Sequence, residues 1–114
     1  MADFKTLNNI AQLNEIDTLS HSRVQIIFKH STRCSVSSMA KRGLDADLRQ
    51  TNRTDFDIYY LDLLNYRDVS NQIATRYGVQ HQSPQILVIR NGQSVFDAAQ
   101  EDVSLSDAWQ SVGA

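Results

Sequence analysis

FKHSTRCSVSS, residues 28–38, contains the only cysteine of the chain, Cys34. The apolar, β-branched run from Val24 to Phe28 precedes it and predicts a strand that is buried on both faces. After the cysteine, apolar residues at i, i+4 spacing predict a helix from Ser35 to about Arg49. The thiol therefore lies between the end of a predicted strand and the start of a predicted helix. A helix N-terminus favours the reactive thiolate form. The alternative interpretation is a small, buried, apolar cysteine without chemistry.

Outside this stretch the pattern predicts alternating helices and strands, followed by a β-hairpin. Asn9 and Gln12 form a capping box, Gly78 is placed to end a helix, and Asn91-Gly92 is typical of a type I′ hairpin turn. The predicted elements are a helix from near Asn9, a strand over 56–63, a helix over 66–77, strands over 85–90 and 93–96, and a short helix after Ser104. This order predicts an α/β domain with parallel units closed by an antiparallel hairpin.

Composition and charge narrow the class of protein. Of 114 residues, 41% are hydrophobic and 21% are charged, which suits one packed domain over residues 1–114. A net charge of -2 gives no general attraction to nucleic acid or to an acidic membrane. No apolar run approaches the length of a membrane span, and the N-terminus lacks the regions of a signal peptide. We therefore expect a cytoplasmic protein with neither nucleic acid nor membrane as a partner.

The single cysteine also limits the redox chemistry that is possible. It excludes an internal disulfide and a self-contained dithiol cycle, so any disulfide of Cys34 must join it to another molecule. The cysteine and the three histidines lack zinc-like spacing. We expect no metal site.

Two segments together resemble a known family. KHSTRC at residues 29–34 and QSPQ at residues 82–85, followed by Asn91-Gly92, resemble the YtxJ-like monothiol bacilliredoxins over residues 10–96. The resemblance implies a thioredoxin-like fold: a central four-stranded mixed sheet flanked by helices, with an N-terminal helix. It also implies that Pro84 is a cis-proline that faces Cys34.

The resemblance further implies a monothiol thiol-disulfide oxidoreductase. Cys34 would attack a mixed disulfide between another protein and a low-molecular-weight thiol of the bacillithiol type, and a second free thiol would regenerate the enzyme. The partners would be S-thiolated proteins and the small thiol, which serves as co-substrate without a further cofactor. Ser37 stands where a Cys-x-x-Cys motif has its second cysteine, so it cannot resolve the disulfide.

Other residues near these motifs are candidates for the site. Lys29, His30 and Arg33 could stabilise the thiolate or bind substrate carboxylates, or they could form a solvated basic loop. Ser37 could donate a hydrogen bond to the thiolate, or it could be an ordinary residue of the first helical turn.

The segment around Pro84 supplies two further candidates. We expect the backbone of Ser83 to pair with a bound disulfide as a strand would, and Pro84 to face the substrate. His81, in the same segment, could approach the site, although we favour an exposed loop histidine.

Three positions depart from the family pattern, and two other functions stay open. Arg33 replaces a threonine, Ser35 a proline and Gln82 a glutamate, and these changes affect which small thiol the site would recognise.

One alternative function is an iron–sulfur carrier of the monothiol glutaredoxin type, although its usual Cys-Gly-Phe-Ser is absent. The other is a redox-inert thioredoxin-like binding module with a buried Cys34.

Overall fold

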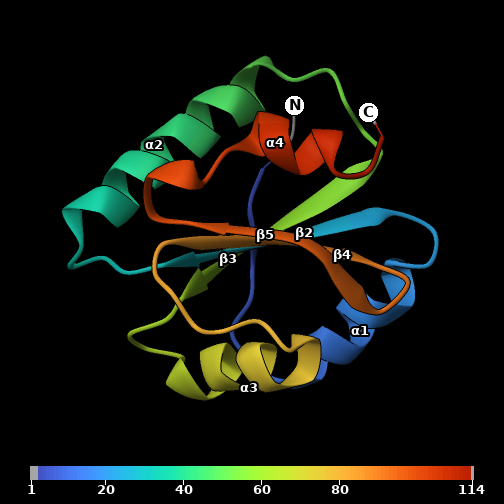
Figure 1. Ribbon diagram of the computed structural model, residues 1–114, viewed down its shortest axis with the longest axis horizontal. Helices are drawn as coiled ribbons and strands as arrows, with labels where there is room; N and C mark the ends of the chain where they lie inside the picture. Colours follow the sequence, from blue (N-terminus) through green and yellow to red (C-terminus); the bar gives the residue numbers. More distant parts are fainter. Residues whose placement is uncertain (1–2, 114) are drawn as a thin grey trace.

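A five-stranded mixed sheet lies between two layers of helices in the computed structural model, which describes residues 3–113. Helices α2 and α4 cover one face of the sheet, and α1 and α3 cover the other (Figure 1). In chain order the elements are β1 (Lys5–Thr6), α1 (Ala11–Leu19), β2 (Val24–His30), α2 (Ser35–Gln50), β3 (Phe56–Asp62), α3 (Arg67–Tyr77), β4 (Gln85–Arg90), β5 (Gln93–Ala99), the 3₁₀ helix η1 (Gln100–Asp102) and α4 (Leu105–Gln110).

The strand order is β1-β3-β2-β4-β5, with β2 parallel to β3 and antiparallel to β4. The four predicted strands are all present in this mixed sheet, and the N-terminal helix precedes them. The predicted count of four strands is wrong by one, because β1 adds a fifth strand at the edge beside β3. With only two residues, β1 is too short to show an alternating pattern in the sequence.

Local signals in the sequence set several boundaries. The Asn9–Gln12 capping box forms, since the Gln12 N–H donates to Asn9 Oδ1 at 3.0 Å and the Asn9 N–H donates to Gln12 Oε1 at 3.1 Å. Gly78 ends α3 in the left-handed conformation, with φ 65°. Asn91 and Gly92 both have positive φ in the β4–β5 turn, as a type I′ hairpin requires.

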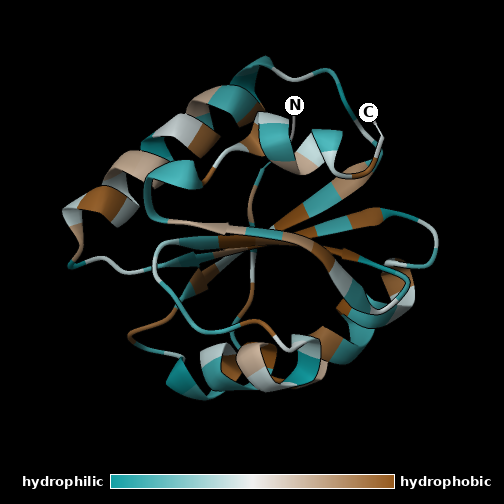
Figure 2. Ribbon diagram, viewed as in Figure 1, coloured by the Kyte–Doolittle hydropathy of each residue, from teal (hydrophilic) through white to brown (hydrophobic). Residues whose placement is uncertain are grey.

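Two apolar cores fill the spaces above and below the sheet. Brown, hydrophobic positions follow the strands and the helix faces that cover them (Figure 2). Successive residues of a strand point to opposite faces, so β2 contributes to both cores. Ile26 and Phe28 pack on the α2 and α4 side, whereas Ile27 packs on the α1 and α3 side. This alternation continues to the end of β2 and decides where Lys29 and His30 point.

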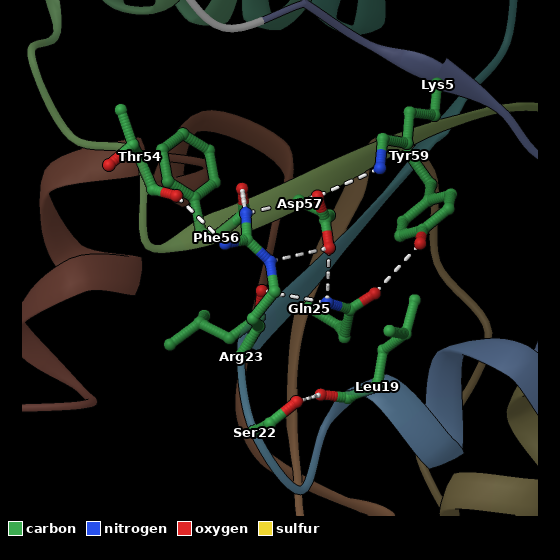
Figure 3. A network of polar contacts seen from close by, with 10 residues as sticks. Lys5, Leu19, Ser22, Arg23, Gln25, Thr54, Phe56, Asp57 and Tyr59 are labelled. Carbon is green, nitrogen blue, oxygen red and sulfur yellow. Dashed lines mark hydrogen bonds and ion pairs between the residues drawn. The ribbon is translucent and has the colours of Figure 1, made fainter.

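A polar network ties three strands together at the amino ends of β2 and β3 (Figure 3). Asp57 lies at its centre, with only 10% of its side chain exposed. It accepts hydrogen bonds from Lys5 Nζ at 2.9 Å, Arg23 Nε at 3.2 Å and Gln25 Nε2 at 2.7 Å. Tyr59 Oη in turn donates to Gln25 Oε1 at 2.8 Å. This network lies at the end of the sheet opposite to the cysteine loop.

Candidate active site

The cysteine loop and the proline loop meet at the same edge of the sheet. Lys29 in β2 pairs with Gln85 in β4, so the next residue of β2, His30, lies beside Pro84, which precedes β4. The end of β3 lies there too, since the Leu63 N–H donates to the His30 carbonyl at 3.1 Å. The Ser83–Pro84 peptide bond is cis, and Pro84 is buried. The fold thus brings the Cys34 loop next to the loop that carries Pro84.

Cys34 is the N-cap residue of α2 and is partly exposed. Its backbone is extended, with φ -113° and ψ 122°, and its carbonyl accepts a hydrogen bond from the Ser38 N–H at 3.0 Å. No side chain caps the first-turn amides of α2. Those amides carry partial positive charge and lie at the helix end where the thiol is held. The position gives a substrate access to the thiol at the start of a helix.

Ser37 is fully buried and binds the loop rather than the thiol. Its Oγ accepts a hydrogen bond from the Ser31 N–H at 3.0 Å and lies 2.7 Å from His30 Nδ1. Among residues 3–113, no hydrogen bond joins Ser37 to Cys34. Ser37 therefore neither bonds to the thiol nor is an ordinary residue of the first helical turn. Its hydroxyl fixes the turn between β2 and α2.

His30 is buried on the α2 side of the sheet. Its ring packs against Phe28 and Tyr60, with centroid distances of 5.7 and 5.4 Å. Burial lowers the pKa of His30, the Lys41 ammonium lowers it further, and Asp62 and Asp45 partly oppose the shift. A histidine whose pKa lies below its usual value of about 6.5 is mainly neutral at pH 7. His30 thus orients Ser37 and the turn, and it supplies little positive charge for a thiolate.

Lys29 lies on the other face of the sheet, because it is the neighbour of His30 in a strand. It is fully buried, and its Nζ donates to the Ser70 carbonyl at 3.3 Å and lies 3.3 Å from His81 Nδ1. His81 is exposed, as expected, and its Nδ1 also lies 3.2 Å from Ser70 Oγ. The prediction that groups Lys29 with His30 and Arg33 around the thiol is therefore not supported. Lys29 instead joins β2 to α3 and the loop before β4.

This buried ammonium leads to a prediction about stability. Burial lowers the pKa of Lys29 to about 8, and no carboxylate among residues 3–113 forms an ion pair with it. Between pH 8 and the unfolded value of 10.5 the unfolded chain binds more protons, so the free energy of unfolding rises with pH in that window. We expect Lys29→Met to stabilise the protein by about 1–2 kcal/mol at pH 7, because the charged form is costly to bury.

The gain from Lys29→Met should shrink as the pH rises from 8 towards 10, where the wild-type ammonium loses its proton. Urea unfolding at pH 7 and at pH 9.5 measures this difference. Lys41→Met is the matched control, because Lys41 is only half-buried and its Nζ is paired with Asp45 at 2.9 Å. A Lys29→Met variant that is less stable than the wild type by the same amount at both pH values would contradict the argument.

Arg33 and Ser83 differ in their availability to a substrate. The Arg33 side chain is exposed and forms no ion pair within residues 3–113, so it remains a candidate for binding a carboxylate. Ser83 has a buried Oγ without a hydrogen-bond partner among those residues. Its carbonyl accepts a hydrogen bond from Gln100 Nε2 at 2.8 Å. A bound substrate that pairs with the Ser83 backbone, as expected from the sequence, would therefore compete with Gln100 for the Ser83 carbonyl.

Gln100 is a residue of the site that the sequence does not reveal. Its backbone N–H donates to the Pro84 carbonyl at 3.0 Å, in addition to the side-chain bond to Ser83. Its φ is 58°, a left-handed conformation that is uncommon for a residue other than glycine. Since Gln100 and Pro84 are far apart in sequence, no local pattern predicts the contact. The two hydrogen bonds anchor the start of β4 to the end of β5.

The described part of the chain gives no sign of a metal site or a membrane helix. Within residues 3–113, no three side chains of the His, Cys, Asp and Glu types are grouped so that they could hold a metal ion. None of the helices there has the length and apolar character needed to cross a bilayer.

A family model for the monothiol bacilliredoxin BrxC matches residues 5–107. The chain belongs to the monothiol bacilliredoxin family. This membership places it among thioredoxin-fold thiol redox proteins, and the residues matched include Cys34, Pro84 and Gln100.

Solved structures agree with this fold. A candidate oxidoreductase with a thioredoxin fold is similar at 29% identity and a TM-score of 0.80, over 94% of this chain and 91% of that one. The thioredoxin of Malassezia sympodialis has 18% identity and a TM-score of 0.76, over 96% of this chain and 91% of its own. The thioredoxin of Trypanosoma brucei brucei has 10% identity and the same TM-score, over 96% and 90%. The last two support the fold alone.

Proposed function

We propose that the chain is a cytoplasmic monothiol oxidoreductase that removes a low-molecular-weight thiol of the bacillithiol type from protein mixed disulfides. One observation carries the proposal: the only cysteine is partly exposed at the uncapped N-terminus of α2, at the sheet edge where Pro84 lies. Partial exposure is needed for attack on a disulfide, and it argues against a module with an inert, buried thiol. Family membership supports the same redox role.

The proposed reaction is two successive thiol–disulfide exchanges. In the first, the Cys34 thiolate attacks the small-thiol sulfur of the mixed disulfide, a new S–S bond forms there, and the old one breaks. The protein substrate leaves as a thiolate and takes up a proton, so its cysteine is reduced. In the second, a free small thiol attacks the adduct on Cys34, releases a small-molecule disulfide and returns Cys34 to the thiolate. The small thiol supplies both electrons as co-substrate.

Arg33 is the best-placed residue for recognising the small thiol. Lys29 and His30 are buried, so Arg33 is the exposed cation of the segment 29–34. A guanidinium binds a carboxylate through two parallel hydrogen bonds, and bacillithiol-type and glutathione-type thiols both carry carboxylates. We propose that Arg33 binds this group and so helps to recruit small thiols that carry a carboxylate.

The proposed function is tested with one carrier protein that bears a single cysteine, prepared as its bacillithiol and its glutathione mixed disulfide. The reduced chain is added with an excess of the matching free thiol, and the mass of the carrier is followed. We expect the carrier adduct to disappear much faster than without the chain, and fastest for the preferred thiol. A rate equal to the background for both adducts would refute the proposal.

Gln100 gives a prediction about how protein substrates bind. In the proposed function a substrate segment pairs with the backbone of Ser83, whose carbonyl is occupied by Gln100 Nε2. Gln100→Ala removes this competing donor while the backbone bond from residue 100 to Pro84 can persist. We expect KM for protein mixed disulfides to fall roughly threefold to tenfold, which corresponds to about one hydrogen bond.

The Gln100→Ala prediction is checked by steady-state kinetics on the carrier mixed disulfide and on a disulfide without amide groups, such as hydroxyethyl disulfide. The second substrate has no N–H to place on Ser83, so its KM should not change. Gln100→Glu tests the same point at nearly the same side-chain volume, because its carboxylate also lacks the donor N–H. Equal losses of kcat on both substrates would instead show that Gln100 only supports the loop.

A further inference from the structure

A groove of about 420 Å³ runs along α2 on the side that faces η1 and the start of α4. Figure 1 shows η1, in orange, beside α2 at the end of the sheet where β4 begins. The groove wall is mostly apolar and includes Val36, Met39 and Leu44 of α2 and Val103 after η1. Met39 is 64% exposed. The wall thus offers apolar surface that the fold itself leaves uncovered.

The groove borders the proposed active site, because residues next to Cys34 and Ser83 line it. Val36, which lines it, is two residues beyond Cys34 in the first turn of α2. Gln100, which lines the opposite wall, hydrogen-bonds the Ser83 carbonyl. A segment that pairs with the Ser83 backbone and carries a disulfide to Cys34 would therefore pass the mouth of the groove.

The charged side chains that line the groove are both negative. Its only charged lining residues are Asp47 and Glu101, and within residues 3–113 neither forms an ion pair. The other carboxylate on this part of α2, Asp45, is paired with Lys41 and does not line the groove. An apolar wall with two unpaired carboxylates is complementary to an apolar side chain next to a cation.

We propose that this groove is a docking site for the protein substrate, which presents an apolar side chain flanked by lysine or arginine. The inference rests on the proposed function, because it names the kind of protein segment that the site accepts. Such docking raises the local concentration of the mixed disulfide at Cys34 and leaves the exchange chemistry unchanged. It therefore distinguishes protein segments from one another and not one small thiol from another.

Gly43 allows the groove to be filled without disturbing the core. A Cβ added at Gly43 would meet no atom within 4 Å, so the position opens into the groove. Gly43→Phe places a ring in the groove, and Gly43→Ala is the matched control that adds only a methyl group. Asp47→Lys combined with Glu101→Lys reverses the charge of the groove, and Glu15→Lys, at an exposed position of α1, is the control for a charge reversal outside the groove.

The substrates are two peptides with one cysteine each, both carrying the same small thiol. One has leucine and lysine near the cysteine and the other has serine and glutamate; the mixed disulfide of free cysteine is the third substrate. We expect wild type and Gly43→Ala to prefer the leucine–lysine peptide by roughly tenfold in kcat/KM. Gly43→Phe and the double reversal should bring that ratio close to one and leave the free-cysteine rate unchanged.

A ratio that stays near tenfold in Gly43→Phe, or that is near one in wild type, would overturn the docking proposal. The free-cysteine substrate distinguishes a failure of the proposed function from a failure of docking. If this substrate does not react, the proposed function fails, and docking is then tested by peptide binding alone. Backbone amide shifts of Gly43 and Val103, which both line the groove, are then followed in ¹⁵N-labelled protein during titration with the leucine–lysine peptide bearing serine for cysteine. Docking is supported if the peptide shifts these amides in the Glu15→Lys variant but not in the double reversal. The absence of shifts in wild type, or self-association of the chain through this face, would overturn it.

Discussion

Replacing Cys34 by serine should lower the rate of de-thiolation on the order of 10³-fold or more, to the rate without protein. A serine hydroxyl at neutral pH does not attack a disulfide, because thiol–disulfide exchange requires a thiolate. No other cysteine exists in the chain to take over the reaction. The fold should be unaffected, since serine is close to cysteine in size and Cys34 is only partly buried.

The rate is measured with the carrier mixed disulfide, and folding is checked by urea unfolding of the same sample. Ser35→Ala is the matched control, because Ser35 is the exposed neighbour of Cys34 in the first turn of α2. We expect the Ser35→Ala rate to remain within about threefold of wild type, since surface changes away from buried contacts have small effects. A Cys34→Ser variant that retains a substantial part of the wild-type rate would show that the activity does not pass through this thiol.

Replacing Asp57 by asparagine should destabilise the fold by about 2–3 kcal/mol at pH 7. Asp57 has a largely buried carboxylate that accepts hydrogen bonds from Lys5, Arg23 and Gln25 (Figure 3). Asparagine keeps the shape but loses the charge, and its NH₂ group turns a donor towards one of these donors. Charged hydrogen bonds that are partly desolvated are worth more than exposed ion pairs.

The same network makes the wild-type stability depend on pH. Hydrogen bonds from Arg23, Gln25 and Lys5 hold the pKa of Asp57 at about 2, although burial alone would raise it. Because the folded pKa lies below the unfolded value of 3.8, the unfolded chain binds more protons between pH 4 and pH 2, so stability is lost as the pH falls through that window. Asp57→Asn lacks this titration and should lose less stability than wild type between pH 5 and pH 2.5.

Urea unfolding at pH 7, 5 and 2.5, followed by far-UV circular dichroism, measures both effects. Asp55→Asn is the matched control, because Asp55 is 60% exposed and pairs only with the neighbouring Arg53. Its effect should stay within about 0.5 kcal/mol, as for most exposed ion pairs. Equal and small effects of the two substitutions would show that the Asp57 network contributes little to stability.

Much of the fold follows from signals that act over a few residues. The reciprocal bonds of Asn9 and Gln12, the left-handed Gly78 and the positive φ values at Asn91 and Gly92 are all local, and all were predicted. β1 was missed because two residues cannot show a period, and it is recognised only by its pairing with β3 in the folded chain. Short edge elements depend on tertiary contacts that the sequence does not display.

The site was predicted less completely, for two physical reasons. The first strand was expected to end at Phe28, whereas β2 runs to His30; strand alternation then sends Lys29 to the α3 side and His30 to the α2 side. The position of Cys34 at the start of α2 depended only on local pattern and was predicted. The anchoring of Ser83 and Pro84 by Gln100 joins two distant segments, so only the folded chain reveals it.

The most direct test of the central claim is the intact mass of the reduced protein after brief exposure to bacillithiol disulfide, with glutathione disulfide in parallel. The account predicts one adduct of a single small thiol, located on Cys34 and absent from Cys34→Ser. It also predicts that excess free thiol removes the adduct and restores the original mass. No adduct from either disulfide, at a pH where free cysteine reacts with both, would contradict the claim that Cys34 is an exchanging thiol.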